Sequence, residues 1–220
     1  MMNIFSMFDP STSMIFSMNW ISSIYIMIII PTIMWLIPNR LIMSINFMMN
    51  YMINELKINL FKKIFLLNFF SLFLFIMMNN FMGLFSYIFT SSSHLLMSMS
   101  LSLPLWMSLM IIGWMFNTNH MFTHQVPNGT PWILMPFMVI IEFISNIIRP
   151  MTLSVRLSAN MIAGHLLLTL ISNNGPKLFI IPTMFLIITQ STLMTLEMSV
   201  SLIQAYVFTI LSSLYSNEIF

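Results

Sequence analysis

Long apolar runs separated by short polar connections make up most of the chain. Several runs reach about 18 residues or more, the length that a helix needs to cross a hydrocarbon core roughly 30 Å thick. The short alternating segments with many turns that a membrane β-barrel would show are absent from the sequence. The pattern therefore predicts an all-α, polytopic membrane protein, with residues 1–220 as a single membrane domain. Five spanning helices are expected, at about 13–37, 64–89, 97–117, 132–171 and 178–215.

Residues 41–63 follow a different pattern from the spans. Asn46, Asn50, Asn54 and Lys57 recur at i, i+4, i+8 and i+11, and the positions between them are mostly Met, Ile, Phe and Leu. Such a spacing places the polar side chains along one stripe of a helix. We expect an amphipathic helix that lies in the membrane interface.

The basic residues predict the orientation of the chain. Residues 1–39 contain no Lys or Arg, and the connection between the first two spans contains Arg40, Lys57, Lys62 and Lys63. The positive-inside rule places that connection on the inner side. The N-terminus is then outside and, after five crossings, the C-terminus inside; Lys177, in an outer loop, is a minor exception.

The last two predicted helices are too long for a perpendicular crossing. Forty helical residues extend about 60 Å at 1.5 Å per residue, twice the hydrocarbon thickness. Pro150 and Pro182 can kink a helix without ending it. We expect two steeply tilted antiparallel helices joined by a short outer loop at "SNNGP". The alternative is that each segment includes a surface stretch at one end.

Composition excludes several other classes of protein. With 59% hydrophobic and 5% charged residues, the chain could not cover a soluble domain with polar groups. It has no cysteine for a disulfide or thiolate site, and a net charge of +2 does not indicate nucleic-acid binding. The 27 Met and 21 Phe suggest AT-rich coding with an altered genetic code, hence an organelle genome. The first residues also lack the features of a cleavable signal peptide.

The charges inside the predicted spans all fall on the last two helices, as Glu142, Arg149, Arg156 and Glu197. Each costs about 2.5–3.5 kcal/mol at a helix centre on insertion scales, and such residues usually line an ion pathway or pair with one another. Glu142, Arg149 and Arg156 are spaced by seven, and so are Gln190, Glu197 and Gln204 on the next helix. Two such stripes on adjacent helices suggest one polar seam.

Further polar and small residues accompany this seam. Asn160 follows Arg156 by one turn, and His165 lies near the predicted depth of Glu197. Small side chains that would let another helix approach closely are Ser158, Ala159, Ala163 and Gly164. Other roles remain open: Arg149 could pair with Glu142 or reach the interface, His165 could be a buried hydrogen-bonded histidine, and Gly164 could serve packing alone.

Metal, cofactor and nucleotide sites are not indicated by the sequence. His120 and His124 have a spacing that could bind a metal on a helix, but no third ligand is near, and we expect a solvated loop there. The acceptor motif at Asn128–Thr130 would lie on the inner side, where it would not be glycosylated. The sequence also has no Gly-rich phosphate loop and no nucleophile–base constellation.

The stretch "SVRLSANMIAGHLLLTLI", with "GTPWILMPFMVIIEFISNIIRP" before it and "LEMSVSLIQAYVFTILSSLY" after it, closely resembles the subunit a family of mitochondrial rotary ATP synthases. "NNFMGLFSYIFT" and "LPLWMSLMIIGW" look like earlier helices of that family, so the resemblance covers nearly the whole chain. It implies a proton-conducting stator subunit of the Fo sector beside the rotating c-ring. The implied partners are the c-ring, the peripheral stalk, other membrane-sector subunits, the bilayer and protons.

The resemblance also implies roles for individual residues. Arg156 matches the essential arginine of the family, and His165 with Glu197 matches the polar pair of the half-channel open to the intermembrane space. Glu142 matches the carboxylate of the matrix half-channel, and Asn160 with Gln204 matches polar residues near the arginine. The implied location is the mitochondrial inner membrane.

Three other kinds of membrane protein fit the sequence less well. A haem-binding redox subunit needs axial histidines at membrane depth, and only His165 qualifies. A self-contained secondary transporter should show internal repeats, which this sequence lacks. A purely structural anchor would not need four charges on one seam.

Overall fold

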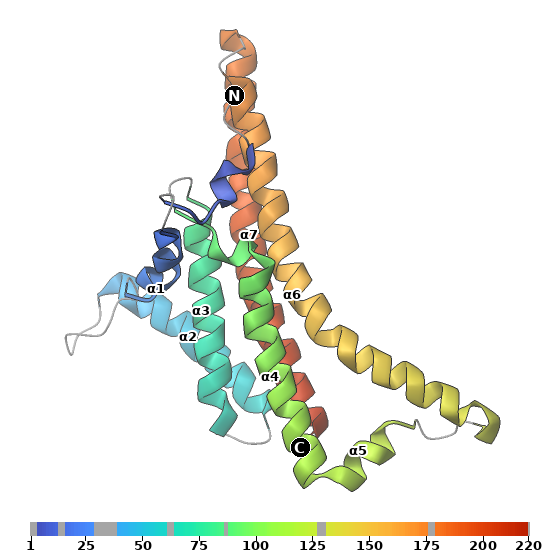
Figure 1. Ribbon diagram of the computed structural model, residues 1–220. Helices are drawn as coiled ribbons and strands as arrows, with labels where there is room; N and C mark the ends of the chain where they lie inside the picture. The colour runs from blue at the N-terminus through green and yellow to red at the C-terminus, as the bar shows by residue number, and fades with distance from the viewer. Residues whose placement is uncertain are drawn as a thin grey trace.

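Helices make up the regular structure of the described part of the chain (Figure 1). The computed structural model describes residues 4–12, 16–28, 39–60, 64–85, 88–126, 131–175 and 179–219. The shorter elements are the 3₁₀ turns η1 (Ile4–Phe8), η2 (Met18–Trp20), η3 (Ser91–Ser93) and η4 (Trp132–Leu134) and the helices α1 (Ile21–Ile28) and α5 (Thr118–His124). The longer helices are α2 (Arg40–Asn59), α3 (Ile64–Gly83), α4 (Leu95–Phe116), α6 (Met135–Asn174) and α7 (Ile180–Ile219).

Within the described residues, four helices, α3, α4, α6 and α7, are long and apolar enough to cross a membrane. The prediction of an all-helical polytopic membrane protein is therefore confirmed. Of the first predicted span, 13–37, the structure describes η2 and α1, whereas residues 29–38 lie outside the described part of the chain. A fifth crossing stays a prediction.

The connection between α3 and α4 differs from the predicted span, which extended to residue 89. The helix ends at Gly83, where the N–H groups of Leu84 and Phe85 bond to carbonyls three residues earlier. The chain then turns through η3, in which Ser91, Ser92 and Ser93 are all buried. The Ser93 hydroxyl donates to the Thr90 carbonyl at 2.7 Å. Hydroxyl side chains that satisfy the local backbone let this turn lie inside the protein.

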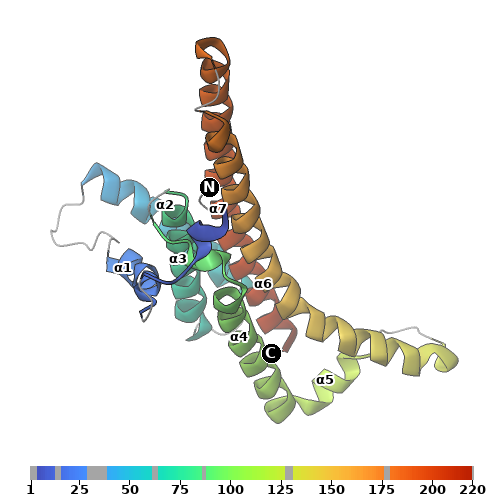
Figure 2. The ribbon, with the colours of Figure 1, turned by 45° about the horizontal axis from the view of Figure 1, so that its top comes forward.

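The amphipathic helix α2 packs against α3 and α7 (Figure 2). Its side chains Met52 and Leu56 are buried, and Phe47 and Ile58 are exposed. On its polar side, Glu55 accepts a hydrogen bond from the Tyr206 hydroxyl of α7 at 2.8 Å. Glu55 is also hydrogen-bonded to Tyr51. This hydrogen bond and the negative charge of Glu55 raise the pKa of Tyr51, since an ionised phenol would be repelled. Glu55 therefore fixes the position of α2 on α7.

Tyr206→Phe should weaken this attachment by about 1–2 kcal/mol, because a hydrogen bond to a charged acceptor is lost while the ring is kept. The measurement is the protection of the α2 amides from hydrogen exchange in the assembled complex, which should decrease in the variant. Tyr215→Phe is the matched control, since Tyr215 lies on a later turn of α7 than Tyr206, the residue that donates to Glu55. Equal protection in Tyr206→Phe and the wild type would rule out this role.

The two C-terminal helices, α6 and α7, are 40 residues long each. In both views the second part of α6 runs alongside α7, while its first part diverges (Figures 1 and 2). Pro150 lies inside α6, where its ring removes one helical hydrogen bond and favours a bend. Pro182 lies in the first turn of α7, where a missing N–H costs little. The tilt of both helices to a bilayer stays a prediction.

The main core lies where α2, α3, α6 and α7 meet. Its buried side chains are Met52, Phe73, Ile76, Leu153, Leu157, Ala205 and Phe208. Because Leu153 and Leu157 belong to α6 and Ala205 and Phe208 to α7, this core fixes the two long helices against each other. It thereby sets the relative positions of the polar side chains that they carry.

Candidate functional site: two polar clusters on the long helices

The first polar cluster brings Glu197 of α7 against Gly164 of α6. A methyl group placed on Gly164 would lie 2.9 Å from Glu197 Cδ and 3.0 Å from its Oε1. The Glu197 carboxyl therefore occupies the space that any larger side chain at 164 would fill. Glu197 is only 8% exposed, and neither carboxyl oxygen has a hydrogen-bond partner among the described residues. Gly164 thus leaves room for a buried acid of the neighbouring helix.

His165 is the second member of this cluster, next to Gly164 in the chain. It is 5% exposed and is hydrogen-bonded to the backbone of Gly83. The Phe8 ring packs edge-on against the imidazole, with ring centroids 6.4 Å apart. Nε2 has no partner within the described part of the chain. The histidine is thus buried and oriented, with one nitrogen able to exchange a proton.

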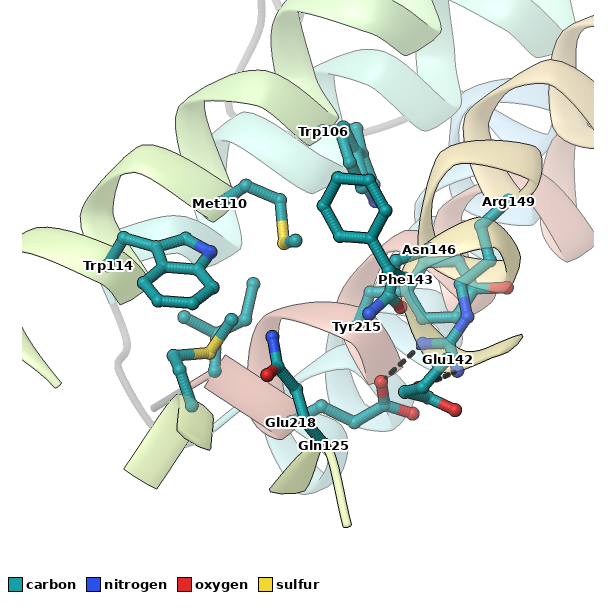
Figure 3. A pocket seen from close by; sticks show the side chains of 12 residues that line it. Trp106, Met110, Trp114, Gln125, Glu142, Phe143, Asn146, Arg149, Tyr215 and Glu218 are labelled. Atoms are coloured by element: carbon teal, nitrogen blue, oxygen red, sulfur yellow. Dashed lines mark hydrogen bonds and ion pairs between the residues drawn. The ribbon is translucent and has the colours of Figure 1, made fainter. Parts of the chain in front are cut away.

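The second polar cluster surrounds Arg149 (Figure 3). Its guanidinium lies 2.6 Å from the Glu218 carboxylate and 3.7 Å from that of Glu142. It also lies over the Tyr215 ring, 5.0 Å from the centroid. The pairing of Arg149 with Glu142, one of the alternatives from the sequence, is confirmed. These side chains line a cavity of about 60 Å³ together with Trp106, Asn146 and others.

Arg156 lies between the two clusters along α6 and belongs to neither. Its side chain is exposed, and it makes no ion pair with any residue in the described ranges. Ala159, Asn160 and Ala163 are exposed on the same side of the helix. By contrast, Ser158 is buried, with its hydroxyl donating to the carbonyls of its own helix. Arg156 therefore lies on an uncovered face lined by small side chains.

The remaining predicted residues are the glutamines of α7. Gln190 and Gln204 are both partly exposed. The helices α6 and α7 are antiparallel, and Gly164 faces Glu197. Leu157, seven residues before Gly164, is therefore level with Gln204, seven residues after Glu197. This register places Gln204 near the level of Arg156. The predicted single seam is thus divided into two clusters, with Arg156 and Gln204 between them.

Two contributors to the second cluster were missed from the sequence. Glu218 lies beyond the last predicted span, which ended at residue 215, and Tyr215 is not among the charged residues of that span. Both belong to the last two turns of α7. Their spacing of three places them on one face of that helix, near the Arg149 guanidinium. The signal was present, but only the fold shows that the end of α7 reaches Arg149.

The predicted loop around His120 and His124 is partly wrong, because residues 118–124 form the short helix α5. Met121 explains the helix, since it is buried against Leu109 and Ile219 at the end of α4 and α7. Within the described residues, no group of three metal-ligating side chains is found. The acceptor motif at 128–130 lies outside those residues.

Comparison with known proteins agrees with these features. Residues 11–217 match the family described as ATP synthase A chain. The chain is 54% identical to the ATP synthase subunit a of Locusta migratoria over 224 residues, with the full length of both chains covered. It is 52% identical to those of Drosophila melanogaster over 230 residues and Aedes aegypti over 225, covering 100% of this chain and 99% of each relative.

Proposed function

The chain belongs to the ATP synthase A chain family and is a proton-translocating subunit of the Fo sector, and we propose that its two polar clusters form two offset half-channels. The observation that carries this proposal is the position of Arg156. It lies on an uncovered face of α6, between one cluster at Glu197 and another at Glu142. Separate clusters provide two proton paths that do not join.

The outer path would pass through the cluster of His165 and Glu197. A buried carboxylate and an imidazole with a free nitrogen can accept and release protons in turn. The proton would next neutralise a carboxylate on a neighbouring c subunit, which could then turn into the lipid. We propose that the surface with Arg156, Ala159, Asn160 and Ala163 faces the c-ring, since its small side chains allow a helix to approach closely.

The inner path would pass through the cluster of Glu142, Arg149 and Glu218. After nearly a full revolution the c-ring carboxylate would release its proton there, beside the cavity that these residues line. Arg156 would favour the ionised form of the carboxylate between the two paths and block a direct leak. Each proton contributes about 2.3 kcal/mol per 100 mV of membrane potential.

The subunit would supply only the proton path, with nucleotide chemistry elsewhere in the complex. Further partners would be the peripheral stalk and other membrane-sector subunits. We place the chain in the mitochondrial inner membrane, with the N-terminus toward the intermembrane space and the C-terminus toward the matrix. The basic residues Arg40 and Lys57 support this orientation.

Glu197→Gln tests the outer path. The amide keeps nearly the same shape beside Gly164 but cannot carry a proton at neutral pH, so passive proton flux should fall by about a hundredfold. Flux is measured on the holoenzyme in liposomes and is normalised to assembled complex. Glu55→Gln makes the same chemical change outside both clusters and should leave flux unchanged. Wild-type flux in Glu197→Gln would remove Glu197 from the path.

A further inference from the structure

A cavity of about 170 Å³ lies between the N-terminal segment and the imidazole of α6. Its polar lining is formed by Ser6, Asp9, Asn19, Thr90 and His165. A water molecule occupies roughly 30 Å³ in the liquid, so the cavity has room for several waters with polar groups to bind them. It therefore joins the first residues of the chain to the first polar cluster.

The imidazole that lines this cavity has a nitrogen without a hydrogen-bond partner among the described residues. His165 is held through the backbone of Gly83, and its Nε2 has no partner among the described residues. A buried polar nitrogen is nearly always hydrogen-bonded to protein or water. The adjoining cavity is lined by the same imidazole, so a small rotation of the ring would bring Nε2, which is closed to solvent in this arrangement, to water that can carry protons to it.

Asp9 also lines this cavity, and it is the only charged side chain before Arg40 in the sequence. Its side chain is exposed, but its backbone is held in place. Its N–H donates to the Ser6 carbonyl at 3.3 Å, and its own carbonyl accepts from Asn19 Nδ2 at 3.2 Å. The preceding Phe8 packs against His165. These contacts hold the backbone of Asp9, so that its exposed carboxylate lies at the lining of the cavity.

We propose that Asp9 collects protons for the cavity that His165 also lines. Its carboxylate attracts hydronium and raises the local proton concentration. The carboxylate accepts a proton from hydronium, leaving water. The carboxyl group then donates that proton through cavity water to Nε2 of His165, and the carboxylate is restored. This assignment rests on the proposed outer path.

The other side chains that line the cavity are not suited to collect protons from solvent as Asp9 is. The lining from the α3–α4 connection, Phe85, Ile88, Phe89 and Thr90, carries no charge. Glu197 faces Gly164, next to His165 in the chain, and belongs to the following step of the path. Within the described residues, Asp9 and His165 are the titratable groups that line the cavity.

The test is proton flux through the holoenzyme in liposomes, with the pH varied on the side of the N-terminus. Asp9→Asn should reduce flux by about tenfold near pH 8, where protons are scarce, and by much less near pH 6. Asp9→Glu should restore the wild-type profile, because it restores the carboxylate. A residue needed only for structure would lower flux by the same factor at every pH.

Equal flux in Asp9→Asn and the wild type at all pH values, or a reduction that does not depend on pH, would overturn the proposal. Should Asp9→Asn fail to assemble, Asp9→Ser is measured in the same way and judged by the same two outcomes. Failure of the proposed function is distinguishable, since it would appear as normal flux in Glu197→Gln, whose carboxyl lies at Gly164 rather than in this cavity.

Discussion

Arg156→Lys is expected to abolish coupled ATP synthesis, with a loss of about a hundredfold or more. Lysine keeps a positive charge but lacks the planar guanidinium, and its pKa falls readily when it is desolvated. At a face that we propose to be covered by the c-ring, it could lose its proton and let the two paths exchange protons directly. The measurement is ATP synthesis and ATP-driven proton pumping in vesicles.

Arg149→Lys is the matched control for this exchange, seven residues earlier on the same helix. Its ammonium would still lie between the carboxylates of Glu142 and Glu218, so the charge remains paired. Synthesis should fall far less than in Arg156→Lys. Normal ATP-driven proton pumping by the Arg156→Lys complex would contradict the role that we propose for Arg156.

The spanning helices, and the charged residues that lie within them, could be predicted from the sequence. Apolar length alone identifies α4, α6 and α7, and the charged residues inside the predicted spans are Glu142, Arg149, Arg156 and Glu197. These inferences succeed because the bilayer imposes length and penalises charge at every position, whatever the neighbouring helices are.

What could not be predicted depends on contacts between distant segments. Spacing by seven placed Arg149 and Arg156 on one face of α6, but α6 bends, and only Arg149 meets the end of α7 at Glu218. The N-terminal turn η1 packs on α6 near His165, although no periodic pattern relates the two. Such contacts are set by the tertiary core, which periodicity within one helix does not specify.

Gly164→Ala is expected to reduce proton flux by about ten- to a hundredfold, since a catalytic group displaced by about 1 Å can lose that much activity. The added methyl would lie 2.9 Å from Glu197 Cδ and 3.0 Å from Oε1, so the buried carboxyl must move. Alanine is otherwise the better helix residue by about 1 kcal/mol. The helix itself should therefore tolerate the change, and the loss should appear in flux rather than in assembly.

Gly175→Ala is the matched control, because a methyl group there meets no atom of the described residues within 4 Å. It should assemble and conduct as the wild type does. A second variant separates displacement of Glu197 from a general packing defect: Glu197→Asp in the Gly164→Ala background shortens the acid by one methylene and makes room for the methyl. Flux should partly recover in this double variant. If it falls further instead, Gly164 acts through packing alone, and the space that it provides for the acid is not what the proton path requires.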